Sequence, residues 1–491
     1  MTKPAPNQPA LNLIPESIDA QLPGGSRLRF CFDEPLMSSD AGLLLLAGHA
    51  AGSGDIARIA ASLAPKLKAP EPGERRPRAP EHSLTELLTQ RVMRLIGGYP
   101  DGNDSTLPRH DPVLQMLVGK DTPGTPEAVL ASQPTMSRLD NGFSLRQLVR
   151  AFDAMVDNFI AGYGGRPPAG LVLDPDPTAC IVYGQQELGM FSTHVGDTCL
   201  MPFHLYEGQS GRLIATALHP GKTPVAKAII GILRRVVRKL RRAWPRLPLV
   251  FRADGHHSKP EVIAWLEREG LDYVIGYAPN AVLERQFAAC IREARMRYEN
   301  HQKEGRPEVE ARTFASGYYS AGSWAGKERR IICRVISGPN GVDARFIVTS
   351  FEVPGAKMLY EKVYCGRGRA ELYIKDHKLG LVSDRLSCTR KEGNAMRLLI
   401  SSLAYQIFEG FRRVSPGGTE LARATFGQVR LRLFKLAAHV RVLKTRVEIH
   451  LSRAHDGSVL LSRVVEQALK VTAFRGLTEA VPAAAPASGC G

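Results

Sequence analysis

The chain has 491 residues, 44% of them hydrophobic, and a formal net charge of +17. This length excludes a short peptide-like chain and predicts two or three structural units around a sizeable core. The positive excess favours a polyanionic partner, with nucleic acid as the first candidate. The sequence has no apolar run of the roughly 18 residues that a membrane-spanning helix needs, so we expect no membrane partner.

Cysteine usage and the N-terminal segment indicate the compartment. The eight cysteines are scattered, without a C-x-x-C pair or zinc-finger spacing, which is typical of a reduced cytoplasm and argues against cysteine-held zinc. The N-terminus lacks the basic start and apolar core of a secretion signal. We therefore expect a cytoplasmic protein.

The chain begins and ends with segments rich in Pro, Ala, Gly and Ser, residues 1–25 and 476–491. This composition offers too little apolar surface to offset the entropy of ordering, so both are predicted to be disordered tails. Residues 26–165 have a mostly helical pattern, which a proline-rich loop over 66–83 interrupts.

Between residues 166 and 280 the pattern changes to strands and intervening helices. A short apolar run that ends in acidic residues is typical of a buried strand whose carboxyl end meets solvent. We predict strands over 170–176, 198–208, 211–219, 247–254 and 271–278, and helices over 223–244 and 259–270.

The order strand, strand, strand, helix, strand, helix, strand is that of a ribonuclease H-like α/β fold, and residues 166–280 form the first part of such a core. In that layout the first and fourth strands are parallel neighbours, so acids past their carboxyl ends share one crevice. Asp254 then faces Asp174 or Asp176, because alternate residues of an extended segment point to the same side.

A β-rich insertion over 281–356 interrupts the core. Its signs are the strand-like runs RRIICRVISG and ARFIVTSF, which are joined by the turn sequence PNGVD. The helical pattern resumes over 357–475, which we predict to be the second part of the core and the C-terminal helices. One of these helices is predicted over 420–443.

The stretch YCGRGRAELYIKDHK lies near the start of this second part. Tyr364, Arg367, Glu371 and Lys378 are spaced so that all four share one stripe of a helix. Two glycines weaken the first turn, so the helix is predicted to become regular only near Ala370.

If this stripe faces the crevice, Glu371 meets Asp176 and Asp254. Three unpaired carboxylates in one cleft repel one another, and a hard divalent cation such as Mg²⁺ or Mn²⁺ resolves the repulsion. Two such ions stabilise both the attacking and the leaving oxygen in displacement at phosphorus. Arg367 and Lys378 would then hold phosphates.

The spacing of this stripe reproduces the pattern Y-(2)-R-(3)-E-(6)-K, and the chain resembles the DDE transposases of bacterial insertion sequences. LDPDPTACIVYGQQE (173–187) and FRADGHH (251–257) resemble the two aspartate blocks of the insertion sequence thirteen-eighty group. LASQPTMSRLDN (130–141) and TELARATFGQVRLRLFKLAA (419–438) resemble further stretches of that group. The likeness covers roughly residues 26–475.

The resemblance implies roles for individual residues. The catalytic, metal-binding triad is Asp176, Asp254 and Glu371, with two bound ions and with Asp174 as the alternative first ligand. The set that contacts DNA phosphates is Tyr364, Arg367 and Lys378.

The resemblance also implies a function. A transposase of this kind cuts double-stranded DNA at terminal inverted repeats and joins the 3′ ends to target DNA, as a homodimer on paired ends in the bacterial nucleoid. The helical region 26–165 would bind DNA. Two alternatives are a catalytically inactive DNA-binding or assembly protein derived from a transposase, and a structure-selective nuclease that never joins strands.

The sequence departs from the group pattern at three positions. Pro177 stands where Ser is common after the first aspartate, and His256 with His257 replaces a small and aromatic pair after the second. All carboxylates remain. Adjacent histidines rarely present both rings to one ion, so we interpret them as loop or DNA-contact residues rather than transition-metal ligands.

Three further features have two interpretations each. Glu371 also fits a solvent-exposed helix face, paired with Lys375. The basic run over 234–242 fits either a solvated helix face or a contact to the DNA backbone. Trp324, in the insertion, fits either a small core or, by analogy with relatives, stacking on a flipped DNA base.

Overall fold

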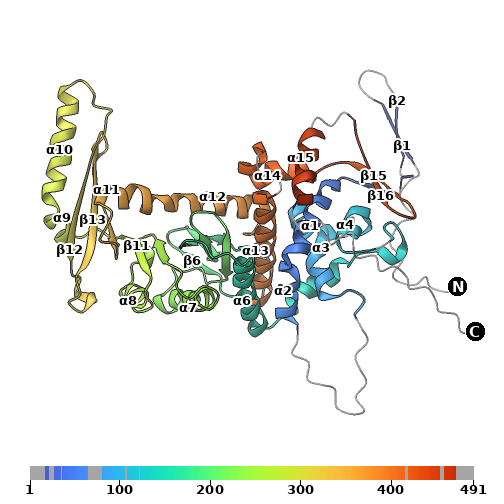
Figure 1. The fold of residues 1–491 in the computed structure, drawn as a ribbon, viewed down its shortest axis with the longest axis horizontal. Coiled ribbons are helices and arrows are strands. Elements are labelled where there is room, and N and C mark those ends of the chain that lie inside the picture. The colour runs from blue at the N-terminus through green and yellow to red at the C-terminus, as the bar shows by residue number, and fades with distance from the viewer. Residues whose placement is uncertain are drawn as a thin grey trace, which may run out of the picture.

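The computed structural model shows an elongated molecule with three parts (Figure 1). Helices from both ends of the chain form one end of the molecule, a mixed sheet lies in the middle, and the insertion forms the other end. A long helical rod that contains α12 crosses the sheet from the insertion towards the helical end. The structure describes residues 17–21, 27–31, 33–34, 36–64, 80–105, 108–120, 122–414, 419–453 and 458–470.

The N-terminal region is mostly helical, as predicted. Ser83 and Glu86 form a capping box that starts α3, and Ser144 and Gln147 do the same for α6. The helices are α1 (Leu44–Ser53), α2 (Asp55–Leu63), α3 (Leu84–Gly97), α4 (Pro112–Leu117), α5 (Gln133–Asn141) and α6 (Leu145–Ala161).

One part of the predicted N-terminal tail is ordered. β1 (Ser17–Gln21) pairs antiparallel with β2 (Arg27–Cys31), so the prediction of disorder is wrong for this segment. The Asp19 carboxylate accepts two hydrogen bonds from Arg29 across this hairpin, a contact that composition does not reveal. The rest of the predicted tail over 1–25, the predicted tail over 476–491 and most of the predicted loop over 66–83 lie outside the described residues.

The central sheet has eight strands in the order β12-β13-β14-β11-β10-β4-β8-β9. β10 is parallel to β4 and to β11, whereas the other neighbours are antiparallel. The predicted parallel pairing of the first and fourth strands is therefore confirmed. The strands of the central part are β4 (Leu171–Pro177), β8 (Phe203–Glu207), β9 (Leu213–Ala217), β10 (Leu249–Ala253) and β11 (Asp272–Tyr277).

Helices cover this sheet from two sides. Figure 1 shows α7 (Ala226–Ala243) and α8 (Pro260–Arg268) on the side opposite the rod. α13 (Lys391–Val414) packs against β9 and α6, and most of its residues are buried. The described residues include no helix that is both long and apolar enough to cross a membrane.

The predicted strand over 198–208 is two strands. β7 (Asp197–Leu200) belongs to a small sheet with β5 (Cys180–Ile181) and β6 (Met190–Ser192), and β8 belongs to the central sheet. Pro202 lies at the break, where its missing N–H interrupts a hydrogen-bonded ladder.

The insertion extends the central sheet rather than forming a separate unit. β14 (Gly341–Thr349) pairs antiparallel with β11, and β13 (Arg329–Gly338) and β12 (Ala311–Tyr319) follow. The sequence predicts β13 and most of β14 but not β12. Two helices, α9 (Ala281–Gln286) and α10 (Ala288–Lys303), also belong to this part.

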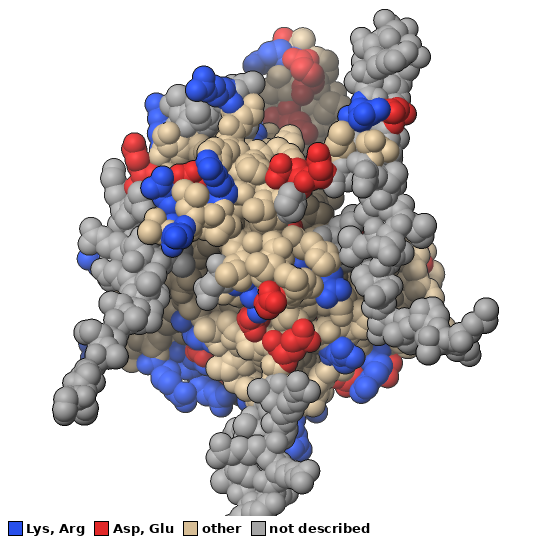
Figure 2. Space-filling view, turned by 90° about the vertical axis from the view of Figure 1, so that its right-hand side faces the viewer, with Lys and Arg blue, Asp and Glu red and all other residues tan. Residues whose placement is uncertain are grey.

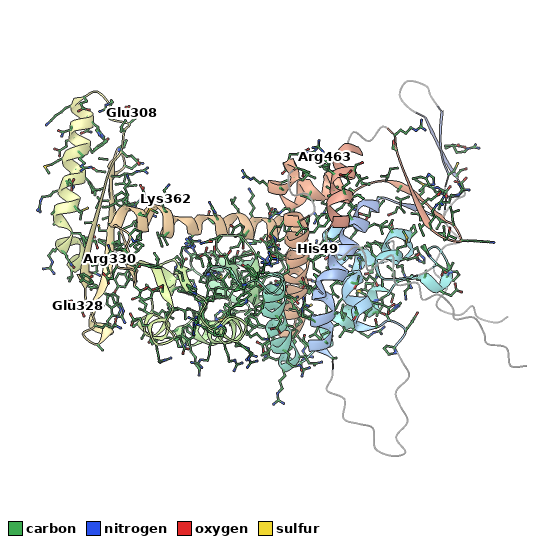
Figure 3. The ribbon with its side chains drawn as sticks, viewed as in Figure 1. His49, Glu308, Glu328, Arg330, Lys362 and Arg463 are labelled. Carbon is green, nitrogen blue, oxygen red and sulfur yellow. The ribbon has the colours of Figure 1, made fainter. Side chains whose placement is uncertain are left out.

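The rod runs from Ala356 to Gly380 and changes its helical type along its length. It comprises α11 (Ala356–Met358), a π-helical segment (Leu359–Tyr364), a 3₁₀ segment (Cys365–Gly368), α12 (Arg369–Lys375) and a second π-helical segment (Asp376–Gly380). Regular α-helix begins at Arg369, in agreement with the prediction. Figure 3 shows Lys362 on the portion of the rod next to the insertion.

The prediction of a helix over 420–443 is wrong for the second half of this range. After α14 (Phe426–Val429), the chain forms β15 (Ala438–Val442), which pairs with β16 (Val447–Leu451) and β3 (Met37–Ser38). Ala438 and Val440 are buried while Arg441 is exposed, an alternation that suits a strand. The last described helix is α15 (Ser458–Lys470).

Acidic and basic side chains are interspersed on the end formed by the terminal regions. Figure 2 shows this face, and its described residues carry blue and red groups close to one another. The net positive charge of the chain is therefore not concentrated in one patch there.

Candidate functional site

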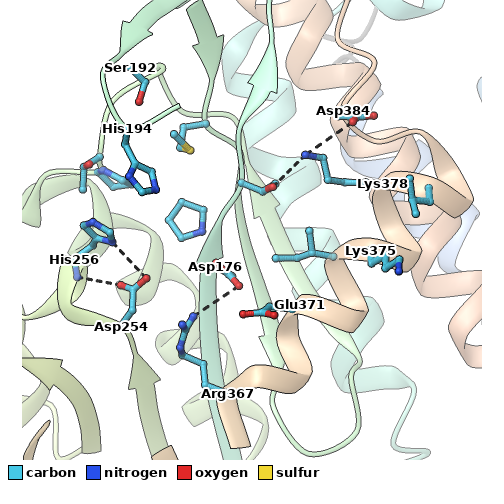
Figure 4. A pocket seen from close by; sticks show the side chains of 17 residues that line it. Asp176, Ser192, His194, Asp254, His256, Arg367, Glu371, Lys375, Lys378 and Asp384 are labelled. Atoms are coloured by element: carbon cyan, nitrogen blue, oxygen red, sulfur yellow. Dashed lines mark hydrogen bonds and ion pairs between the residues drawn. The ribbon is translucent and has the colours of Figure 1, made fainter. Parts of the chain in front are cut away.

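The three predicted acids line one cavity of about 680 Å³. Asp176 lies at the end of β4, Asp254 directly follows β10, and Glu371 belongs to α12. Figure 4 shows the three side chains around this space, with Glu371 beside Asp176. Residues far apart in sequence thus meet at the carboxyl end of two parallel strands.

The register of the sheet explains this meeting. Phe251 of β10 pairs with Leu173 of β4, so three further residues along each strand place Asp254 level with Asp176. Both strands are largely buried up to this point, and their Leu, Val and Phe side chains fix their position in the core, while Asp174 and Arg252 are the charged exceptions. The acids therefore come directly after the segments that hold the sheet together.

A buried arginine connects this sheet to the rod. Arg252 Nε and Nη2 donate to the two carboxylate oxygens of Asp174 at 2.8 and 2.5 Å. Its Nη1 donates to the Val363 carbonyl at 2.7 Å and its Nη2 also donates to the Gly208 carbonyl at 3.3 Å. This group, which we call the Arg252 brace, joins β4, β10 and the rod that carries Glu371.

Asp174 is thereby engaged away from the cavity. Its side chain is fully buried and does not line the cavity, whereas that of Asp176 does. Burial raises the pKa of the Asp174 carboxyl, although Arg252 acts in the opposite direction. Asp174 and Asp176 share a face of β4, but only Asp176 is open to a ligand.

Asp176 lies in a field of several charges. Its Oδ2 is 3.9 Å from Nη1 of Arg367. Burial, with a smaller contribution from the charges of Asp254 and Glu371, raises the pKa of Asp176 to about 6 despite the opposing effect of Arg367. The mutual repulsion expected from clustered carboxylates is thus present at this position.

Asp254 is held by the turn that follows it. Its carboxylate accepts hydrogen bonds from the His256 backbone N–H at 3.0 Å and from His257 Nδ1 at 2.9 Å. Burial alone raises the pKa of Asp254, but the hydrogen bond from His257 and the nearby positive charge, including Arg367, lower it well below its usual range. Asp254 is a firmly anchored carboxylate.

The two histidines have different environments. The His257 side chain is 1% exposed, and its Nε2 has no hydrogen-bond partner among the described residues. His256 is exposed and lies on the cavity wall, where its ring approaches that of His194 with centroids 6.3 Å apart. His257 therefore supports Asp254 from within the core, and His256 faces the cavity.

The predicted phosphate contacts are distributed around the cavity. Arg367 and Lys378 line it, and Lys378 Nζ donates to the Ala179 carbonyl at 2.9 Å. Tyr364 is not part of the lining; its ring packs against Tyr360 with centroids 5.3 Å apart. Two of the three predicted residues are thus placed to meet a ligand in the cavity.

Glu371 is exposed and has no hydrogen bond or ion pair with any residue that the structure describes. The alternative pairing of Glu371 with Lys375 is not observed, although Lys375 also lines the cavity. The carboxylate of Glu371 is therefore available to a ligand.

Sequence reasoning missed one wall of the cavity. Ser192 and His194 come from β6 and the turn that follows it, and Thr223 and Pro224 come from the segment before α7. Strands of two to four residues, such as those of the small sheet, carry no periodic signal that could have identified them.

Trp324 lies in a packed cluster in the insertion. It is 4% exposed, and its ring contacts Tyr277 and Tyr319 with centroids 5.3 and 5.6 Å away, while the Arg329 guanidinium lies over it at 4.8 Å. The structure agrees with the small-core interpretation. Stacking on a DNA base would require Trp324 to leave this cluster.

The donor set suits a hard divalent cation, because it consists of three carboxylates whose mutual repulsion such an ion would relieve. In the described part of the chain, however, no three His, Cys, Asp or Glu side chains are already arranged to hold an ion together. The guanidinium of Arg367 lies next to Asp176, so binding an ion at Asp176 involves an adjustment of this side chain. The chemistry of the residues fits a metal site that closes around its ligand.

Comparison with known proteins identifies the class. Residues 21–472 match the family described as "Transposase DDE domain group 1", and the chain belongs to this family of DDE transposases. Divalent metal ions are generally used by the family. No curated protein matches the sequence.

Among solved structures, the chain is similar to a piggyBac transposase in a synaptic complex with hairpin DNA, determined by electron cryo-microscopy. The two chains are 13% identical, the match covers 91% of this chain and 87% of the other, and the TM-score is 0.41.

Proposed function

We propose that this protein cuts DNA at terminal inverted repeats and joins the freed 3′ ends to target DNA, with Asp176, Asp254 and Glu371 as the catalytic, metal-binding residues. The observation that carries the proposal is that these three acids, from two strands and one helix, line a single cavity in a chain of the DDE transposase family. Asp176 is proposed as the first ligand in preference to Asp174, which the Arg252 brace occupies.

The strand order supports a ribonuclease H-like core. Strands β9, β8, β4, β10 and β11 lie in this order, with β4, β10 and β11 parallel. We infer that residues 166–280 and 357–475 form this core around the insertion over 281–356. The finer assignment to the insertion sequence thirteen-eighty group rests on the sequence blocks described above.

The residues of the site have different roles in the proposed phosphoryl transfer. Two Mg²⁺ or Mn²⁺ ions, when bound, supply stabilisation of the attacking and leaving oxygens. Asp254, oriented by His257, together with Asp176 and Glu371, supplies the oxygen ligands. Arg367 and Lys378 contact the phosphate on the cavity wall and orient it.

The remaining roles follow from the same proposal. Tyr364 supports the phosphate-contacting residues from within the rod. The helical region 26–165 recognises the terminal repeats, and the protein acts as a homodimer on paired ends in the nucleoid of a bacterial cytoplasm.

Isosteric substitution of each acid tests the proposal. D176N, D254N and E371Q should each abolish Mg²⁺-dependent cleavage of DNA that carries the inverted ends flanking the gene, without loss of DNA binding. D272N is the matched control, since Asp272 is an exposed acid at the amino end of β11, whereas the acids of the site lie at the carboxyl ends of the strands parallel to it. Full cleavage by any of the three variants would contradict the assignment.

The same assay separates the two alternatives. Wild-type protein that binds the ends but never cleaves them with Mg²⁺ or Mn²⁺ is an inactive assembly protein. Protein that cleaves but yields no strand-transfer product with supercoiled target DNA is a nuclease.

A further inference from the structure

The basic residues of α7 form two sets with different surroundings. Arg235 donates to both carboxylate oxygens of Asp153 at 3.0 and 2.6 Å, and Lys239 Nζ lies 2.6 Å from an oxygen of Asp157. Both acids belong to α6. This first set attaches α7 to α6, so its charges are already compensated within the protein.

The second set has no such compensation. Lys227, Arg234, Arg238 and Arg242 are exposed, and none of them has a hydrogen bond or ion pair with a residue in the described parts of the chain. At 100° per residue these four positions lie on one stripe, opposite the face that α7 buries in the core. We call them the α7 stripe.

A stripe of this kind is unfavourable for the free protein. Like charges four residues apart on a helix destabilise it, and both Arg234 with Arg238 and Arg238 with Arg242 have this spacing. Cations are attracted to the negative, C-terminal end of a helix dipole, but this attraction is significant only in the last turn. Arg241 and Arg242 occupy that last turn of α7. The helix dipole therefore does not explain Arg234 or Lys227.

The position of the stripe relates it to the proposed catalytic site. Thr223 and Pro224 line the cavity, and α7 starts two residues later at Ala226. α7 lies on the side of the sheet opposite the rod (Figure 1). The cavity is lined by four carboxylates, of Asp176, Asp254, Glu371 and Asp384, and by only three Lys and Arg side chains, so it has no excess of positive charge for the rest of a DNA duplex.

The spacing of the stripe suits a phosphate backbone. Residues four apart on a helix are separated by a rise of about 6 Å. Phosphates recur about every 3.4 Å along each strand of duplex DNA, and long arginine side chains adapt to this repeat. Such contacts carry no sequence information.

We propose that the α7 stripe binds the sugar-phosphate backbone of duplex DNA, without sequence preference, where the duplex leaves the catalytic cavity. The inference rests on the proposed DNA-cutting function and adds a binding surface to it. It assigns to one face of α7 a share of the affinity for DNA, in addition to the contacts of Arg367 and Lys378 inside the cavity.

The test compares charge removal on two helices. R234Q/R238Q/R242Q is measured by fluorescence anisotropy with a random-sequence duplex over a series of salt concentrations. Loss of three phosphate contacts should reduce the slope of log Kd against log salt by about 2 to 3. R234K/R238K/R242K should keep most of the slope, because it retains the charges. Equal melting temperatures show that the variants are folded.

R292Q/R295Q/K303Q is the matched control, since it removes three exposed cations from α10 at the insertion end of the molecule. An unchanged slope in the α7 variant, or an equal reduction in the α10 variant, would overturn the inference. Failure of the proposed cutting function can be distinguished from failure of this inference. In the former case, wild-type protein binds DNA with the steep salt dependence but does not cleave it.

Discussion

The Arg252 brace makes the fold and the site depend on one side chain. Arg252→Ala removes four hydrogen bonds, two to Asp174 and one each to the Val363 and Gly208 carbonyls. It leaves the Asp174 carboxylate fully buried without its cation. Breaking a buried ion pair in this way typically costs about 3–5 kcal/mol, so the free energy of unfolding should fall by that amount.

The measurement is urea unfolding followed by circular dichroism, with a matched control on an exposed pair. Arg29→Ala breaks the contact of Arg29 with Asp19, whose side chains are 64% and 66% exposed, and should change the free energy of unfolding by no more than about 1 kcal/mol. Since the brace also holds the rod at Val363, the proposed cleavage activity should fall along with stability in Arg252→Ala.

A double substitution identifies the cause. R252M/D174L replaces both buried charges by apolar side chains, so no uncompensated charge remains, and the variant should be more stable than Arg252→Ala. The reasoning is refuted if Arg252→Ala lies within about 1 kcal/mol of wild type, or if the double variant is no more stable than the single one.

Three further predictions concern single residues. His257→Phe removes the hydrogen bond that orients Asp254 and should reduce single-turnover cleavage by about 10- to 100-fold, with a raised Mg²⁺ requirement and unchanged DNA affinity. In Gly276→Ala the added Cβ would lie 2.8 Å from the backbone nitrogen of Gly255, in the loop after Asp254. The free energy of unfolding, measured with urea, should therefore fall by about 1–3 kcal/mol. Gly322→Ala is the control and should cause no loss, because a Cβ at Gly322 would meet no neighbouring atom. Burial and the neighbouring Arg413 lower the pKa of His49, a residue of α1 that is labelled in Figure 3, to about 4. As the pH falls, the unfolded chain therefore binds a proton at His49 before the folded protein does. The free energy of unfolding should keep its full value above pH 6.5 and should fall by up to about 3 kcal/mol as the pH decreases towards 4. Urea unfolding over this pH range should show a smaller decrease for His49→Gln, and an identical pH profile would contradict the assignment.

The position of the acids was predictable because local signals and the order of the elements determine it. Apolar runs that end in acidic residues predicted β4 and β10, and the order of elements predicted their parallel pairing, which the structure confirms. The start of regular helix at Arg369 followed from the glycines before it. Residues next to each feature in sequence decide the strands and the start of the helix, whereas the pairing of the two strands follows from the order of the elements.

Other parts of the site depend on contacts between distant segments. The choice between Asp174 and Asp176 cannot be read from their spacing, because both lie on the same face of β4. It depends on Arg252, which is 78 residues from Asp174 in the chain. Likewise, β15 forms where a helix was predicted, because its neighbours β16 and β3 supply the hydrogen bonds that a strand requires.

The three acids differ in how the protein holds them. Asp176 is part of a β ladder, and Asp254 is fixed by hydrogen bonds from its own turn. Glu371 has no hydrogen bond from the described residues, so its location depends on the backbone of α12.

That backbone is anchored on both sides of α12 by buried or partly buried arginines. Arg252 contacts the Val363 carbonyl before α12, and Arg412 of α13 donates to Asp376 at 2.7 Å directly after it. The rod is thus tied to the sheet at one point and to the helical end at the other. The proposed metal site therefore combines two carboxylates that the sheet holds in place with a third, that of Glu371, whose side chain is free to adjust around a ligand. This difference explains why the three acids share a cavity without being already arranged around an ion.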